Sequence, residues 1–253
     1  MHRTIAIGTA AGLLVALAGI LPASAGENHG DDGHHSDGGT AELTVFHGVP
    51  GLTVDVYVDG ALTLDDFEPG TFSDTLTLDA GTYSVAVTAA DATDDSHPVI
   101  GPIDLTLEEG DNYTVAAHLT EAGDPTATLF TNNLDKAGKG NGRLTVRHIA
   151  AAPSVDVLAN GAAAVSDLTN PDEEELTLPV GTISAVVAAT GTTDPLIGPT
   201  DVEIAKRTNT IVYAWGSLDA DNLAFAVQTV GLTGGGHHHH KDHHDDHHND
   251  HHK

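Results

Sequence analysis

An internal duplication most constrains how this chain can fold. Five short segments of the first half return in the same order in the second half, at a nearly constant offset. The pairs are 43–47 with 144–148, 54–56 with 155–157, 59–60 with 160–161, 81–84 with 181–184, and 98–102 with 195–199. Ordered repetition of this kind indicates a repeated structural unit. We therefore expect two tandem domains, 42–132 and 143–232, joined by a Gly-, Asn- and Lys-rich linker at 133–142 that does not dock them rigidly.

Within each copy, apolar and polar residues alternate over short runs, which is the period of a β-strand. The dipeptides Asp59-Gly60 and Asn160-Gly161 favour tight hairpins, because their residues tolerate positive φ. The alternating runs of the first copy are 43–47, 54–58, 83–87, 103–107, 113–117 and 127–129. Six or seven antiparallel strands per copy, without helical periodicity, predict an all-β fold of two tandem immunoglobulin-like antiparallel β-sandwich domains.

The segments LTVFHGVPGLTVDVYVDG and LTVRHIAAAPSVDVLANG carry a family resemblance. They resemble the domain of unknown function 4397 family, which occurs in exported microbial proteins, often as tandem copies. The matching residues are His47, Pro50, Val54, Asp55, Val56, Asp59 and Gly60 in the first copy, and His148, Pro153, Val155, Asp156, Val157, Asn160 and Gly161 in the second. The resemblance covers about residues 42 to 232 and implies exported β domains, but the family has no established activity to carry over.

Residues 1–25 have the organisation of a signal peptide. Arg3 provides the positive start, residues 5–21 are apolar, and Ala23-Ser24-Ala25 is a small-x-small cleavage site. An N-terminal membrane anchor is the alternative, although the apolar run is short for a full span. We expect a secreted or cell-surface protein, periplasmic if the source has an outer membrane, with no transmembrane segment in the mature chain.

The charge balance limits the class of partner. The chain has 37 acidic and 9 basic residues, for a net charge of −28 with His neutral. Such a chain repels nucleic acid and anionic membrane surfaces and attracts cations. It has no cysteine, which excludes disulfides and thiolate metal sites. We expect no nucleic-acid partner.

Both ends of the mature chain are rich in His and Asp, and we expect both, 26–41 and 233–253, to be disordered. Neutral imidazole is a good ligand for divalent transition metals, so we expect these ends to bind zinc foremost, or nickel or copper. An expression tag is the alternative for the tail, but acidic residues interrupt its His pairs regularly. The candidate metal ligands are His29, His34, His35, His237, His238, His239, His240, His243, His244, His247, His248, His251 and His252. Because imidazoles titrate near pH 6.5, acidification is expected to weaken this binding.

Two histidines inside the repeats are candidates for a different role. His47 and His148 occupy equivalent strand ends and, by parity, the apolar face. One interpretation is a ligand or site residue. The other is a half-buried side chain that donates to a loop backbone group and holds the following proline loop, because buried polar groups are usually hydrogen-bonded.

Carboxylates in the repeats allow further cation sites. Asp55 and Asp156 point away from the apolar face, either to bind a cation or to form a solvated strand face. One loop of the first copy contains Asp91, Asp94, Asp95 and His97, whose oxygen ligands suit Ca²⁺, but it lacks the order of a known calcium loop. A solvated loop is the alternative.

Sequence signatures of catalysis are missing. There is no G-x-S-x-G, H-E-x-x-H or Walker motif. We therefore expect a non-enzymatic, secreted or cell-surface binding or scaffold protein whose tail binds metal ions and whose domains have a cell-surface or matrix protein as partner. The second hypothesis is a structural or adhesive envelope or matrix protein without specific metal function. A secreted hydrolase is the remote third.

Overall fold

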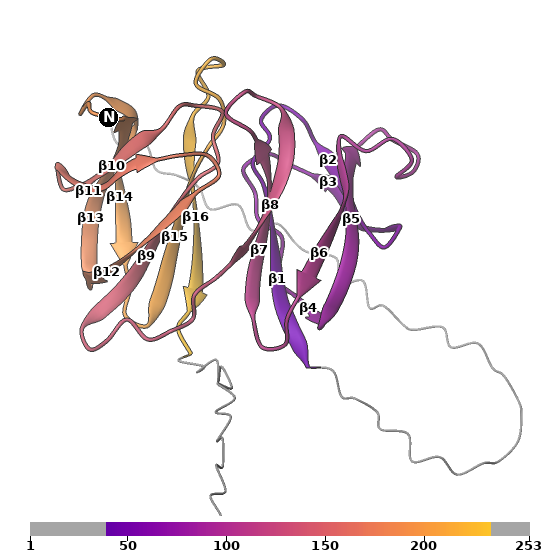
Figure 1. The fold of residues 1–253 in the computed structure, drawn as a ribbon, viewed down its shortest axis with the longest axis horizontal. Helices are drawn as coiled ribbons and strands as arrows, with labels where there is room; N and C mark the ends of the chain where they lie inside the picture. The colour runs from indigo at the N-terminus through magenta and orange to yellow at the C-terminus, as the bar shows by residue number, and fades with distance from the viewer. Residues whose placement is uncertain (1–38, 234–253) are drawn as a thin grey trace, which may run out of the picture.

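The computed structural model describes residues 39–233, and all its named elements are β-strands. They form two β-sandwiches side by side, the first coloured indigo to magenta in Figure 1 and the second orange to yellow. The predicted signal peptide, nearly all of the N-terminal segment 26–41 and the His-rich tail lie outside the described residues. No helix in the described range is long and apolar enough to cross a membrane.

Each sandwich contains eight strands. The first comprises β1 (Thr40–His47), β2 (Val54–Val58), β3 (Ala61–Phe67), β4 (Leu76–Asp79), β5 (Gly81–Ala89), β6 (Ile100–Leu107), β7 (Asn112–Leu119) and β8 (Pro125–Thr131). The second comprises β9 (Asn141–His148), β10 (Val155–Ala159), β11 (Ala162–Leu168), β12 (Glu173–Pro179), β13 (Gly181–Ala189), β14 (Pro195–Ile204), β15 (Thr208–Trp215) and β16 (Ala224–Gly231).

The two sandwiches have the same topology. The sheets of the first are ordered β4-β1-β7-β8 and β3-β2-β5-β6, and those of the second β12-β9-β15-β16 and β11-β10-β13-β14. The predicted all-β fold of tandem sandwiches is therefore confirmed. The strand count exceeds the six or seven expected. Each sandwich combines its antiparallel pairings with one parallel pairing, β1 with β7 in the first and β9 with β15 in the second.

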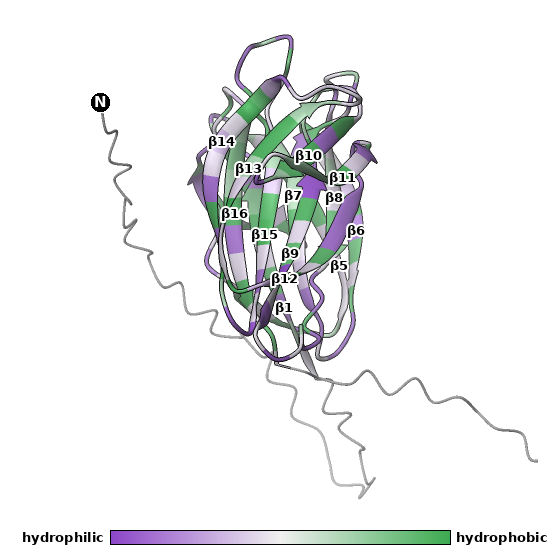
Figure 2. Cartoon of the chain, turned by 90° about the vertical axis from the view of Figure 1, so that its left-hand side faces the viewer, coloured by the Kyte–Doolittle hydropathy of each residue, from purple (hydrophilic) through white to green (hydrophobic). Residues whose placement is uncertain are grey.

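Local sequence explains the hairpins and the cores. Asp59 and Gly60 have φ values of 49° and 75° between β2 and β3, as a tight hairpin turn requires. Inward-facing Val54 and Val56 are 2% and 3% exposed within the first core. Figure 2 shows hydrophobic and hydrophilic bands following one another along the strands of the second sandwich. Each sandwich thus buries one face of each of its two sheets against the other.

A third apolar cluster joins the two sandwiches. Phe46 of β1 is fully buried on the outer face of its sheet, with its ring centroid 5.0 Å from that of Tyr213 and 6.1 Å from that of Trp215. Phe72 adds a ring 4.5 Å from Phe46. The other buried members are Ala116, Phe130, Ile149, Ile211 and Ala226. The sheets containing β1 and β9 therefore face each other across a packed interface (Figure 1).

A buried arginine completes this interface. The guanidinium of Arg147 donates to the Tyr213 hydroxyl at 2.6 Å, to Asn132 Oδ1 at 2.9 Å and to Glu173 Oε2 at 2.7 Å. Its carbon Cζ lies 4.3 Å from the centroid of the Phe130 ring. Asn132 and Phe130 belong to the first sandwich, so the contact crosses between repeats. The expectation of loosely joined domains was wrong, because this interface docks them whatever the composition of the linker.

Candidate functional site

The predicted metal-binding histidines of the tail, together with His29, His34 and His35, lie outside the described residues. The structure does place the two strands from which these segments leave. β1 begins and β16 ends at the same end of the molecule (Figure 1). A groove of about 390 Å³ between the sandwiches is lined by Glu42 and Thr44 on one side and by Val230 and Gly231 on the other. The first and last strands therefore border one groove.

The groove has a polar floor on the side of the first sandwich. Asn112, which is 5% exposed, donates through Nδ2 to Glu42 Oε2 at 2.6 Å. The hydroxyls of Thr44 and Thr75 lie 3.3 Å apart. Side-chain oxygen atoms thus line the groove that β1 and β16 border.

His47 and His148 have a structural role in the loops that follow them. Both are 1% exposed, and Nε2 of each lies at hydrogen-bonding distance from a loop carbonyl, 2.7 Å from Leu52 and 3.0 Å from Pro153. A carbonyl only accepts, so Nε2 carries the proton and the buried Nδ1, which has no partner, does not. Burial lowers the pKa of both rings. The hydrogen-bonding interpretation is confirmed, with both side chains more buried than expected.

For Asp55 and Asp156 the sequence left two interpretations, cation binding or a solvated strand face, and the solvated face is wrong for Asp55. Asp55 is 4% exposed, and its Oδ1 accepts the backbone N–H of Asp66 at 2.9 Å. Asp156 accepts the backbone N–H groups of Asp167 and Gly191, both at 2.9 Å, and these bonds lower its pKa. In each repeat the aspartate of the Val-Asp-Val motif holds a β-bulge of the neighbouring strand.

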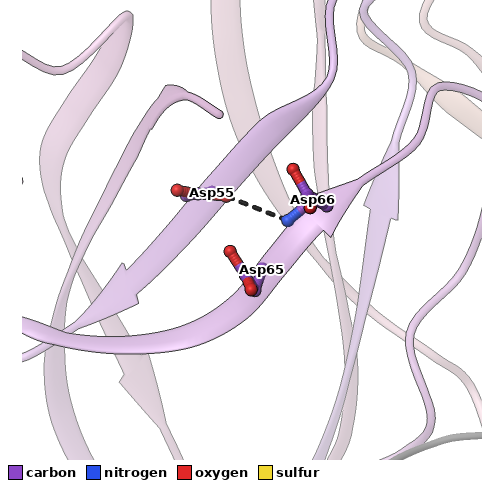
Figure 3. Close-up of side chains that lie close together, drawn as sticks. All are labelled: Asp55, Asp65 and Asp66. Atoms are coloured by element: carbon purple, nitrogen blue, oxygen red, sulfur yellow. Dashed lines mark hydrogen bonds between the residues drawn. The ribbon is translucent and has the colours of Figure 1, made fainter. Parts of the chain in front are cut away.

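Three carboxylates come together at the bulge of the first sandwich. Asp65 and Asp66 on β3 lie opposite Asp55 on β2, and one oxygen from each lies within 4.8 Å of the others. Figure 3 shows the three side chains close together, with the hydrogen bond from the backbone of Asp66 to Asp55. Sequence reasoning singled out Asp55 but missed Asp65 and Asp66. The sequence feature that could have identified these two residues is the acidic pair that they form shortly after the Asp59-Gly60 hairpin.

The acidic loop that follows β5 lies near this cluster. Asp94 Oδ1 accepts the backbone N–H and the hydroxyl of Ser96, at 3.0 and 2.5 Å, which lowers the pKa of Asp94. Asp91 and His97 are exposed, as in a solvated loop. Burial, and then the charges of Asp55, Asp95, Asp94 and Asp65, raise the pKa of Tyr57. Loop and bulge thus share one negatively charged surface around this tyrosine.

A family comparison agrees with the sequence resemblance. Residues 41–158 match the family described as Domain of unknown function (DUF4397). The match spans the first sandwich and continues through β9 and most of β10 of the second. It confirms the resemblance, and the description of the family assigns no activity.

Other known proteins add little. No curated protein sequence matches the chain. One similar solved structure is CBMbc, of family CBM26, from Eubacterium rectale Amy13K in complex with maltoheptaose, with 13% identity over 75% of this chain and 96% of that chain and a TM-score of 0.22. Another is a leucine-rich repeat protein from Bacteroides thetaiotaomicron, with 14% identity over 70% of this chain and 26% of that chain and a TM-score of 0.19. TM-scores this low support no inference about fold or function.

Proposed function

Starting from a first repeat that matches a family without an assigned activity, we propose that this protein is an exported, non-enzymatic scaffold for metal binding. The docked sandwiches hold the His- and Asp-rich ends of the chain beside each other. These ends bind divalent transition metals, zinc foremost. The apolar 17-residue run and the small-x-small site near the N-terminus support export.

The observation that carries the proposal is the groove shared by β1 and β16. His35 precedes Thr40 by five residues, and His237 follows Gly231 by six. An extended chain spans at most about 3.6 Å per residue, so about 20 Å separates each of these histidines from its strand at most. Two ligand segments fixed at neighbouring points have a high effective concentration for each other. Imidazoles from both ends can therefore complete the coordination of one ion.

The donor set suits zinc. Zinc in proteins takes four N, O or S ligands, and these segments offer imidazole nitrogen and carboxylate oxygen without thiolate. The paired histidines repeat every four residues from His239, which multiplies the sites along the tail. The rigid body supplies solubility and a fixed anchor.

The two alternative functions, a structural or adhesive protein and a hydrolase, require different features of the structure. A structural or adhesive envelope protein would use the acidic surface and need no transition metal. A hydrolase would need paired free carboxylates in a pocket. A hollow of about 490 Å³ is lined by four acidic residues, Asp167, Asp172, Glu173 and Glu174. Asp172 accepts the hydroxyl of Thr169, and Glu173 pairs with Arg147. The proposal of a non-enzymatic protein rests on the missing sequence signatures of catalysis.

The test is calorimetric titration of Zn²⁺ and Ni²⁺ into three mature chains. These are residues 26–253, the same chain ended after Gly235, and the full chain with His29, His34 and His35 replaced by Gln. We expect the full chain to bind several ions and the shortened chain to lose most of them. If the ends share ions, the triple replacement weakens binding although the tail is intact. If no chain binds below about millimolar metal, the structural or adhesive role follows instead.

A further inference from the structure

We propose that the first sandwich also binds a Ca²⁺ ion, at the β-bulge where Asp55, Asp65 and Asp66 meet. This site is independent of the chain ends, because it uses other residues, another class of ligand atom and a hard cation.

The bulge brings the carboxylates together. Val54 pairs with Phe67 and Val56 with Leu64, so two residues of β3 stand opposite the single residue Asp55 of β2. Asp66 has a φ of 51°, a left-handed conformation that turns its N–H towards Asp55. The hydrogen bond occupies Oδ1 of Asp55, and within the described residues no hydrogen bond occupies Oδ2. One oxygen of Asp55 is therefore available to a cation beside the two exposed carboxylates.

A buried hydroxyl without a partner lies on the same face. Thr88 of β5 is the register partner of Asp55, and opposed residues of paired strands present their side chains on one face. Thr88 is 0% exposed, and its Oγ1 makes no hydrogen bond. An unsatisfied buried hydroxyl costs free energy. The oxygen of Thr88 would either coordinate the bound cation or hydrogen-bond to a water on that cation.

The rest of the sandwich offers no positive charge for these groups. Residues 42–132 contain 17 Asp and Glu and no Lys or Arg, and the two salt bridges found within residues 39–233 are both in the second sandwich. The loop carboxylates of Asp94 and Asp95 add negative potential around Tyr57. A cation from solution is therefore the natural counter-charge.

The chemistry selects calcium. All the donors are oxygen atoms, which hard cations prefer. The cluster contains no imidazole or thiolate, the ligands that zinc and copper favour. Calcium accepts irregular coordination with several waters, whereas magnesium demands near-octahedral geometry. Three carboxylates at a surface are typical of weak extracellular sites, with a Kd on the order of 10⁻⁴ to 10⁻³ M.

The second sandwich is an internal comparison for the site. Ser166 stands where the first has Asp65, and Ala188 where it has Thr88. The second oxygen of Asp156 is occupied by the N–H of Gly191. The bulge is retained without the ligands, so the additional carboxylate and hydroxyl are not needed to form it.

Terbium luminescence tests the proposal on the full mature chain. Tb³⁺ is a hard, oxygen-seeking cation that emits when a nearby tyrosine absorbs light, and Tyr57 lies two residues from Asp55 on the same strand face. Neither end of the mature chain contains Tyr or Trp, so ions bound there emit little. We expect tyrosine-sensitised emission that millimolar Ca²⁺ abolishes, in the range given for weak sites. Tyr57→Phe should remove the emission.

Two variants make the test specific. Asp65→Ser copies the second sandwich, removes an exposed side chain without hydrogen bonds, and should weaken Ca²⁺ competition by about tenfold or more. Asp124→Ser removes the same charge from an exposed loop and should leave competition unchanged. Equal binding by the Asp65→Ser variant, emission that survives Tyr57→Phe, or Mg²⁺ competing as well as Ca²⁺ would overturn the proposal. Circular dichroism confirms that each variant is folded.

Discussion

Three histidines within residues 39–233 are buried near strand ends, where little water is available to solvate a protonated, charged ring. His47 and His148 each bond a loop carbonyl, and His118 bonds the carbonyl of Leu119 through Nδ1 and the Thr128 hydroxyl through Nε2. Burial lowers the pKa of all three rings below the ordinary 6.5. Burial therefore favours the neutral form of each ring in the folded state.

These histidines predict loss of stability in mild acid. Below the ordinary pKa of 6.5 the unfolded chain binds protons that the folded chain excludes, so stability falls as the pH decreases from there towards the lowered pKa values. Urea unfolding between about pH 7.5 and pH 5.5 should show a falling midpoint. A midpoint that stays level over this range would contradict the assignment of neutral rings.

Sequence parity found His47 and His148 but not the acidic cluster. Their place on the apolar face follows from strand period alone, which is local information. Asp65 and Asp66 meet Asp55 only because a bulge shifts the register of β3 against β2. Strand period does not reveal such a shift, since one extra residue moves every later side chain to the other face.

At the scale of elements, the strands of the first sandwich that the sequence did not predict are β3 and β4, which bury little of their side-chain surface. β3 is exposed or half-buried along its whole length, and β4 has only four residues, at the edge of its sheet. Alternation is weak where neither face of a strand is buried. The parallel pairing of β1 with β7 joins residues about 70 apart in the chain, such as Glu42 and Asn112, and no local pattern encodes it.

The interface between the two sandwiches was also not predicted from the sequence, although one pair of equivalent repeat positions differs in a way that reflects it. Phe46 and Arg147 are equivalent positions, and each is buried on the face turned away from its own core. The two residues differ because the interface is asymmetric. The ring of Phe46 in the first repeat faces the second sandwich, and the guanidinium of Arg147 in the second repeat faces the first. A buried arginine remains stable there because three acceptors and a ring surround it.

Phe46→Ala should loosen this interface. The lost ring leaves a cavity beside Tyr213 and Trp215, and Phe-to-Ala changes in packed regions cost about 3 kcal/mol or more. Trp215 is the sole tryptophan, so a red shift of its emission reports water entering between the sandwiches. Leu62→Ala, on the exposed surface of β3, should change neither emission nor stability. An unshifted Trp215 spectrum in the Phe46 variant would contradict packing of the two sandwiches around Phe46.

At the scale of the whole molecule, charge is distributed unevenly between the two repeats, although their folds are the same. The first sandwich has no basic residue between 42 and 132, whereas the second has Arg143, Arg147, Lys206 and Arg207. Two of these, Arg143 and Arg147, form salt bridges with Glu175 and Glu173 of the same sandwich. Self-repulsion therefore concentrates in the first sandwich and opposes its compact state.

Salt should consequently stabilise the protein, even with calcium removed by a chelator. Screening shortens the reach of charge from about 10 Å at 0.1 M salt to about 3 Å at 1 M, so the thermal midpoint should rise with NaCl. Asp104 on β6 is exposed, and its carboxylate forms no hydrogen bond or ion pair within the described residues. Asp104→Lys should raise the midpoint at low salt more than Asp104→Asn does, and both gains should vanish near 1 M, because screening leaves no repulsion to relieve. Gains that persist at high salt would indicate a local packing effect instead of relief of long-range repulsion.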